Sequence, residues 1–204
     1  MVKIKICGIS RPKDIEAVNL AKPDYVGFVF AKSPRQVSFE QAANFRAGLF
    51  GDILVVGVFV NEKIETVCEC ANAGIIDIIQ LHGEEDDEYI KKIKDLTGKQ
   101  VIKAVSVTSK EDVLACESSC ADFVLFDAKA PGSGVVFDWS VLQYSLRPFF
   151  LAGGLNIENV QEAIFKTQPL VVDVSSGVER GLGIKDFDKI VEIVRLVRGE
   201  QGGN

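Results

Sequence analysis

The sequence contains very little histidine, the commonest metal ligand in proteins. Among its 204 residues there is one histidine, His82, together with one tryptophan and one methionine. The cysteines number five, and an odd count in a reducing compartment favours free thiols over a disulfide framework. The pairs Cys68/Cys70 and Cys116/Cys120 fall within helical patterns, whereas structural zinc sites usually place their ligands on tight turns. We therefore expect no metal site.

Long apolar runs are also lacking. No stretch approaches the roughly 20 uncharged residues needed to span a membrane, and the amino terminus lacks the apolar region of a signal peptide. We expect a soluble, cytoplasmic protein that does not bind membranes. The formal net charge of −6 argues against a broad nucleic-acid-binding surface, which requires clustered Lys and Arg. A small anionic ligand is still compatible with this composition if its positive partners are local.

Short β-rich apolar runs alternate with segments of helical period along the chain, a pattern typical of parallel βαβ units. The predicted strands are residues 3–6, 25–30, 54–59, 76–81, 101–105, 123–126, 149–151 and 171–174. The predicted helices lie near residues 12–21, 39–49, 63–73, 86–96, 110–117, 139–144, 157–165 and 186–198.

Eight strand-helix units in strict alternation predict a (β/α)₈ TIM barrel, a single α/β domain over residues 1–200, with a disordered tail at 201–204. A doubly wound open sheet has the same alternation. However, it usually carries a G-x-G-x-x-G turn after its first strand, and no such turn is present here.

The first predicted strand ends at Cys7, and a glycine follows at once. Strand residues alternate between faces, so Lys3, Lys5 and Cys7 share one side while Ile4 and Ile6 share the other. Two lysines and a thiol on one face are unusual for an ordinary core. The strand alone still allows Cys7 to be a small buried hydrophobe, which is what most free cysteines are.

Polar side chains follow three of the other predicted strands, where a barrel of this class carries its active site. Arg35 follows the second strand and could bind a carboxylate through two N–H groups, or simply be solvated. His82 follows the fourth strand and could donate a hydrogen bond or cap the strand end. Asp127 follows the sixth strand and could be a proton donor or a turn-forming residue.

Glycine-containing turns follow the last two predicted strands. Gly153 and Gly154 come after the seventh strand, and Ser175, Ser176 and Gly177 come after the eighth. Glycines let backbone N–H groups approach a phosphate closely, and the loops after these two strands are the recurrent phosphate site of such barrels. We therefore predict that the two turns bind a phosphate group.

Eight short motifs occur in order over nearly the whole chain. They are Lys5-Ile-Cys-Gly8, Gly27-Phe-Val-Phe30, Ser33-Pro-Arg35, Val58-Phe-Val-Asn61, Gln80-Leu-His-Gly83, Phe137-Asp-Trp139, Ala152-Gly-Gly-Leu-Asn156 and Val172-Asp-Val-Ser-Ser-Gly-Val-Glu179. Their succession resembles the phosphoribosylanthranilate isomerase family of tryptophan biosynthesis. That resemblance implies an Amadori rearrangement without metal or organic cofactor. In this reaction N-(5-phosphoribosyl)anthranilate opens its ribose ring and becomes 1-(2-carboxyphenylamino)-1-deoxyribulose 5-phosphate.

The resemblance also implies residue roles. By motif position, Cys7 resembles the general base that removes the C2 proton, and Asp127 resembles the general acid that protonates the ring oxygen. Arg35 resembles the partner of the anthranilate carboxylate, and the two glycine-containing turns resemble the phosphate site. His82 and Asp173 occupy matching positions and are taken as substrate-binding residues.

A catalytic Cys7 would need a cationic neighbour, because a thiol with an ordinary pKa of about 8.5 is mostly protonated at neutral pH. Lys5 lies on the same strand face, about 6.6 Å away by strand rise. In a closed barrel the first and eighth strands are neighbours, so Lys5 could instead pair with Asp173, and its effect on Cys7 would then be smaller. The sequence leaves both arrangements open.

Two departures from the family pattern fall in loops. The segment 130–136 is shorter than usual and carries Val135 where Lys or Thr is commoner, and Leu182 stands where proline is commoner.

Two alternative functions are a related phosphate-binding isomerase of histidine biosynthesis and a non-catalytic barrel that binds a phosphate ligand. The first usually has an aspartate at the end of its first strand, so Cys7 argues against it. We expect a monomer or a homodimer.

Overall fold

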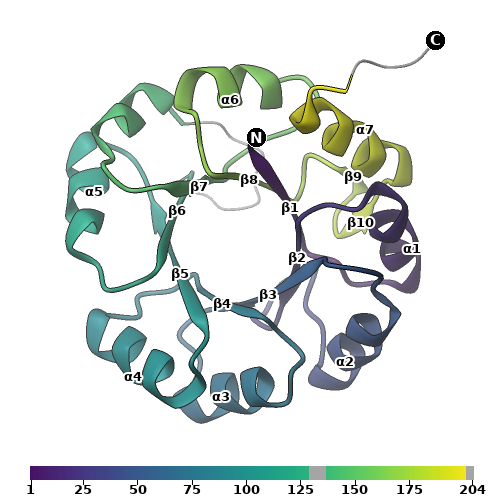
Figure 1. Cartoon of the computed structure of the whole chain (residues 1–204), viewed down its shortest axis with the longest axis horizontal. Coiled ribbons are helices and arrows are strands. Elements are labelled where there is room, and N and C mark those ends of the chain that lie inside the picture. The colour runs from purple at the N-terminus through teal and green to yellow at the C-terminus, as the bar shows by residue number, and fades with distance from the viewer. Residues whose placement is uncertain (129–136, 201–204) are drawn as a thin grey trace.

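The structure is a computed structural model that describes residues 1–128 and 137–200. Within these residues eight parallel strands form a closed barrel in chain order, and helices surround it (Figure 1). The predicted (β/α)₈ architecture is therefore confirmed. The expectations for the loop at 130–136 and the tail at 201–204 lie outside the described residues.

The barrel strands are β1 (Lys3–Cys7), β2 (Tyr25–Val29), β3 (Leu54–Phe59), β4 (Ile78–Leu81), β5 (Gln100–Ser106), β6 (Phe123–Asp127), β7 (Phe149–Leu151) and β8 (Val171–Val174). The α-helices are α1 (Pro12–Ala21), α2 (Phe39–Gly48), α3 (Ile64–Asn72), α4 (Asp87–Thr97), α5 (Lys110–Ala115), α6 (Val160–Thr167) and α7 (Phe187–Arg198). Two 3₁₀-helices, η1 (Cys116–Ser118) and η2 (Trp139–Tyr144), and a hairpin of β9 (Glu179–Gly181) and β10 (Ile184–Lys185) complete the described elements.

Most predicted boundaries are within two residues of the observed ones, and the larger differences have local causes. The segment predicted as a helix at 139–144 is the 3₁₀-helix η2. The helix predicted from residue 157 begins only at Val160, because Asn156 Oδ1 accepts hydrogen bonds from the N–H groups of Glu158 and Asn159. The hairpin β9–β10 was not predicted, since its two strands are very short.

Alternation along the strands divides the apolar residues into two cores. Ile4 and Ile6 of β1 face outward and belong to the larger core between strands and helices. A smaller core fills the barrel interior with side chains such as Tyr25, Ile102 and Phe150. Lys5 lies between Ile4 and Ile6 and points the other way, as the alternation predicts.

The pairing of β1 with β8 closes the barrel and sets the register that the site depends on. Lys5 lies beside Asp173 in this register, and Ile6 lies beside Val174. A fully buried ammonium group is expensive unless it is paired, and the neighbouring strand supplies its carboxylate. The closure therefore brings together two residues that are far apart in sequence.

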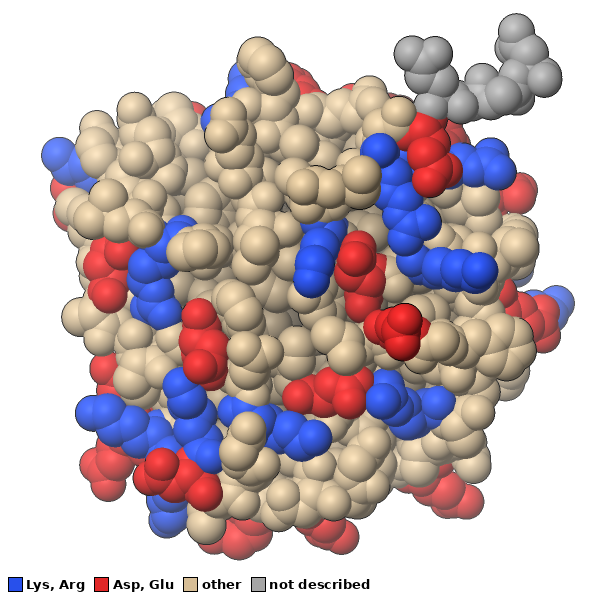
Figure 2. Space-filling view, in the orientation of Figure 1, with Lys and Arg blue, Asp and Glu red and all other residues tan. Residues whose placement is uncertain are grey.

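The surface shows no extended field of positive charge on the face drawn in Figure 2, where Lys and Arg are interspersed with Asp and Glu. Among the described residues, no helix combines the length and the apolar character required to cross a membrane.

Candidate functional site

A cavity of about 280 Å³ opens at the carboxyl ends of the barrel strands. Nine of the ten predicted site residues line it: Cys7, Arg35, His82, Asp127, Gly153, Gly154, Asp173, Ser175 and Ser176. The tenth, Gly177, does not line the cavity and packs against the backbone of Leu155 and Asn156. The barrel therefore brings the predicted residues together from β1, β6, β8 and the loops after β2, β4, β7 and β8.

Cys7 is the last residue of β1, and its thiol lies over Gly27 of the neighbouring strand. A Cβ atom added at Gly27 would be only 2.6 Å from Cys7 Sγ, so glycine makes room for the thiol. Burial raises the pKa of Cys7; the positive charges of Lys5 and Lys185 oppose this, while the carboxylate of Asp173 adds to it. In this state Cys7 is therefore a neutral thiol at neutral pH.

Lys5 pairs with Asp173, which answers the question that the sequence left open. Its Nζ lies 2.8 Å from Asp173 Oδ2 and 2.7 Å from Gln80 Oε1. Burial acts to lower the pKa of Lys5, but the negative charge of Asp173 and its hydrogen bond to Lys5 act in the opposite direction, so the pKa is raised and the amine stays charged. Because the carboxylate of Asp173 offsets the positive charge of Lys5, Lys5 alone does not convert Cys7 to a thiolate.

Asp127 ends β6 and is held at both carboxyl oxygens. Its Oδ1 accepts a hydrogen bond from the N–H of Ala128 at 2.7 Å. Its Oδ2 lies 3.4 Å from His82 Nε2. Residue 82 is fixed in turn by its own N–H, which donates to the carbonyl of Phe59 at 2.8 Å. The carboxyl group therefore has a defined orientation at the cavity wall.

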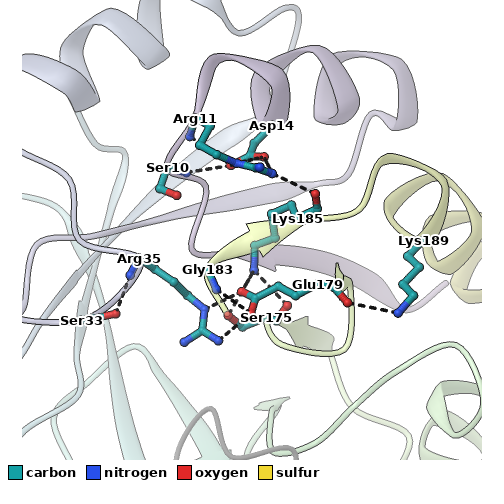
Figure 3. A network of polar contacts seen from close by, with 10 residues as sticks. All are labelled: Ser10, Arg11, Asp14, Ser33, Arg35, Ser175, Glu179, Gly183, Lys185 and Lys189. Atoms are coloured by element: carbon teal, nitrogen blue, oxygen red, sulfur yellow. Dashed lines mark hydrogen bonds and ion pairs between the residues drawn. The ribbon is translucent and has the colours of Figure 1, made fainter. Parts of the chain in front are cut away.

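Arg35 occupies the loop after β2, and its guanidinium is paired with Glu179 (Figure 3). Nε donates to Glu179 Oε1 at 2.6 Å, and Nη2 donates to Oε2 at 3.0 Å. A guanidinium has five N–H donors, so this pair leaves three for another partner, including both on Nη1. The pair raises the pKa of Arg35, chiefly through the hydrogen bonds to Glu179.

Glu179 joins Arg35 to a second cation, Lys185, at the centre of the network in Figure 3. Lys185 Nζ lies 2.9 Å from Glu179 Oε1 and also donates to the carbonyl of Ser175 at 2.9 Å. Burial acts to raise the pKa of Glu179, but Arg35 and Lys185 outweigh it and lower the pKa to about 2. The hairpin β9–β10 thus ties the loop after β8 to the loop that carries Arg35.

The two glycine-containing turns adopt backbone conformations that favour glycine or leave no room for a side chain. Gly153 has a φ of 87°, and an added Cβ would lie 2.8 Å from the backbone nitrogen of Ala128. At Gly177 an added Cβ would collide with the carbonyl of Leu155. The two turns therefore meet through their backbones, without side chains between them. Such an arrangement lets backbone N–H groups approach a phosphate.

Three residues at this site were not predicted from the sequence: Gln80, Glu179 and Lys185. Gln80 and Glu179 lie within the quoted motifs, but the sequence did not show which side chains they would face. Lys185 lies on the unpredicted hairpin, so nothing in the sequence placed it beside Ser175. Among residues 1–128 and 137–200, no group of three or more His, Cys, Asp or Glu side chains could hold a metal ion.

Comparisons with known proteins show the family to which this chain is similar. The family model described as N-(5'phosphoribosyl)anthranilate (PRA) isomerase matches residues 4–196. A relative from Endomicrobium trichonymphae named N-(5'-phosphoribosyl)anthranilate isomerase is 48% identical over 202 residues, which covers 97% of this chain and 99% of the relative. A relative of the same name from Clostridium acetobutylicum is 48% identical over 206 residues, covering 97% of this chain and 98% of the relative.

Solved structures give the same result. The phosphoribosyl anthranilate isomerase from Thermotoga maritima superimposes with a TM-score of 0.88 at 39% identity, covering 98% of this chain and 100% of the other. A structure of such an enzyme in complex with reduced 1-(o-carboxyphenylamino)-1-deoxyribulose 5-phosphate has a TM-score of 0.85 at 38% identity, with the same coverage.

Proposed function

We infer the reaction of this chain from its family, because the chain belongs to the N-(5'-phosphoribosyl)anthranilate isomerase family. The chain converts N-(5'-phosphoribosyl)anthranilate into 1-(2-carboxyphenylamino)-1-deoxyribulose 5-phosphate, a step of tryptophan biosynthesis. The observation that carries this conclusion is the convergence of nine predicted site residues on one cavity, in a chain with close relatives of that name.

Asp127 is the proposed general acid. Opening of the ribose ring breaks the C1–O bond, and the ring oxygen takes up a proton as it leaves. Once Asp127 has given its proton, the N–H of Ala128 and the imidazole of His82 face its two oxygens. Hydrogen bonds to a carboxylate are stronger than those to a neutral acid, so these contacts favour the transfer.

Cys7 is the proposed general base. Ring opening leaves a Schiff base at C1, which acidifies the neighbouring C2–H enough for a moderate base to remove the proton. The enolamine that forms then gains a proton at C1 and loses one from the C2 hydroxyl, which completes the isomerisation. Since burial keeps the resting Cys7 protonated, the active thiolate fraction rises with pH.

The phosphate of the substrate is proposed to bind between the turns after β7 and β8. Ser175 and Ser176 line the cavity together with Gly153 and Gly154. Lys185 supports this region because its ammonium group holds the carbonyl of Ser175. Its positive charge also favours a dianionic ligand nearby.

Arg35 and Asp173 are proposed to bind the rest of the substrate. Glu179 occupies the Nε side of the Arg35 guanidinium, so the anthranilate carboxylate binds at the free end formed by the two Nη groups. Asp173 Oδ1 is buried and has no hydrogen-bond partner within the described residues. Because Asp173 lines the cavity, its Oδ1 atom can accept a hydrogen bond from a ribose hydroxyl of the substrate.

Turnover measurements with two variants test the catalytic roles. With freshly generated phosphoribosylanthranilate and fluorescence detection, we expect Cys7→Ser and Asp127→Asn each to lower kcat by about 10²–10⁴-fold, the usual contribution of an acid or base. Cys68→Ser and Asp122→Asn are matched controls, because both residues lie outside the cavity. Wild-type activity in either test variant would remove that residue's role, and an inactive wild type would refute the isomerase function.

The family and the net charge support a proposal for the localisation, partners and oligomeric state of the enzyme. We propose a cytoplasmic enzyme with a single barrel domain over residues 1–200, which needs no nucleic-acid or membrane partner and is a monomer or a homodimer. The net charge of −6 and the free state of all five cysteines support this setting. Size-exclusion chromatography with light scattering distinguishes the two oligomeric states.

A further inference from the structure

A chain of polar side chains, of which His82 is half-buried and the others are buried, connects β8 and β1 with β4 and β6. Lys5 Nζ lies between Asp173 Oδ2 at 2.8 Å and Gln80 Oε1 at 2.7 Å. Gln80 Nε2 is 3.2 Å from His82 Nδ1. His82 Nε2 is 3.4 Å from Asp127 Oδ2. The proposed mechanism uses Asp173, His82 and Asp127 of this chain and gives no role to Gln80.

The direction of each hydrogen bond follows from the chemistry of its donor. An ammonium group can only donate, so Lys5 requires the oxygen of the Gln80 amide on its side. The amide nitrogen of Gln80 then faces His82 and can also only donate. His82 Nδ1 must therefore accept, which leaves the ring proton on Nε2, the nitrogen that faces Asp127.

We propose that Gln80 is a positioning residue that holds His82 in the Nε2–H tautomer and so keeps an N–H donor aimed at Asp127. Gln80 is almost fully buried and lines the cavity at the barrel mouth. Its amide cannot turn over without placing its NH₂ group against Lys5 and its oxygen against Nδ1. The charge of Lys5 thus sets the tautomer of a ring that it does not contact itself.

The tautomer matters for the reaction because Asp127 changes charge when it protonates the ring oxygen. The Nε2–H group of His82 stabilises the carboxylate that results, whereas the other tautomer would present a lone pair to it. This inference rests on the proposed function for its catalytic consequence. The tautomer itself can be measured without any substrate, so the two can fail separately.

The chain contains a single histidine, which makes the measurement direct. In protein labelled with ¹⁵N-histidine, two-bond correlations to the ring carbon-bound protons identify which nitrogen carries the proton. At mildly alkaline pH we expect protonated Nε2 and unprotonated Nδ1 in the wild type. A wild type with its proton on Nδ1 would overturn the proposal.

Gln80→Glu is the decisive variant because it is close in size and keeps an oxygen for Lys5, but replaces the donor that faces Nδ1 with an acceptor. We expect Nδ1 to become protonated and kcat to fall on the order of tenfold or more, with a smaller change in KM. Gln80→Met, which removes both hydrogen bonds without adding charge, should lower kcat as well while Asp173 still pairs with Lys5.

Gln41→Glu is the matched control. Gln41 is exposed on α2, where its side chain accepts a hydrogen bond from the N–H of Ser38, a role that glutamate can also fill. It should change neither the tautomer nor kcat. An unprotonated Nδ1 in Gln80→Glu, or a changed tautomer without any fall in kcat, would refute the role of Gln80.

Discussion

Asp173→Asn tests how the buried charges control the thiol of Cys7. Burial is the main cause of the raised pKa of Cys7, and the carboxylate of Asp173 adds to it, while Lys5 acts in the opposite direction. Asparagine has the same shape and keeps an oxygen for Lys5, but it carries no charge. In the variant the positive charge of Lys5 is no longer compensated, so the thiolate becomes more favourable.

The expected size of the change in the pKa of Cys7 follows from the barrel geometry. Asp173 lies beside Lys5 in the register, and Cys7 is two residues further along β1. Strand rise and spacing then put the two residues about 8 Å apart. At an effective dielectric constant of about 20 the lost repulsion is about 2 kcal/mol, or between one and two pKa units. The thiolate fraction at neutral pH should rise on the order of tenfold or more.

The assay is the dependence of kcat/KM on pH. Because the pKa of Cys7 is raised above its ordinary value, kcat/KM of the wild type should still increase with pH above neutrality. In Asp173→Asn this rise should move to lower pH by at least about one unit. The maximum value should fall, since Asp173 is also proposed to contact the substrate. The position of the rise, rather than its height, reports on the thiol.

Asp77→Asn is the control for a lost ion pair, because Asp77 pairs with Arg46 at 2.8 Å just before β4, away from the cavity. It should leave the pH dependence unchanged. A ¹³C titration of labelled cysteine detects the same shift without substrate. An unaltered profile in Asp173→Asn, or a shift to higher pH, would show that the charge balance around Lys5 does not set the basicity of Cys7.

Two further predictions concern the ion-pair network around Glu179. Arg35→Ala should lower kcat/KM by about tenfold to a few hundredfold, since a charge-assisted contact contributes about 1.5–3 kcal/mol, and an unchanged kcat/KM would contradict the carboxylate contact. Glu179 should make the fold sensitive to acid, because its pKa falls from 4.5 to about 2 on folding. By linkage, ionised Glu179 contributes about 3 kcal/mol to the free energy of unfolding. This contribution is complete above pH 4.5 and is lost as the pH falls toward 2. Urea unfolding at about pH 6 and about pH 3 measures this loss, and Glu179→Gln should lose less stability over that interval than the wild type; an equal loss in both proteins would contradict the assignment.

Much of the barrel could be predicted because its strands and helices have strong local patterns. The runs at 54–59, 149–151 and 171–174 match the observed strands, since each is mostly apolar and is flanked by loop residues. The predicted start of β4 was two residues early. Ile76 is buried outside the barrel, and Asp77 instead accepts a hydrogen bond from the N–H of Val55. Such a boundary depends on the neighbouring strand and is not visible in the local pattern.

Residues that line the cavity could be predicted where they have reactive chemistry and stand at a strand end, as Cys7 and Asp127 do. Partners that act by pairing were harder to find. Glu179 and Lys185 acquire their roles only when the hairpin after β8 folds back onto Ser175. The arrangement of Lys5 also required the closed barrel, because its carboxylate partner lies 168 positions away in sequence.

The central claim is that Cys7 removes the C2 proton of the substrate. The most direct test is a single-turnover measurement of C2–H cleavage, using phosphoribosylanthranilate deuterated at C2 of the ribose, in the wild type and in Cys7→Ser. We predict cleavage about 10²–10⁴-fold slower in Cys7→Ser, with substrate binding retained through Arg35 and the phosphate turns. Loss of deuterium at the wild-type rate in Cys7→Ser would contradict the claim.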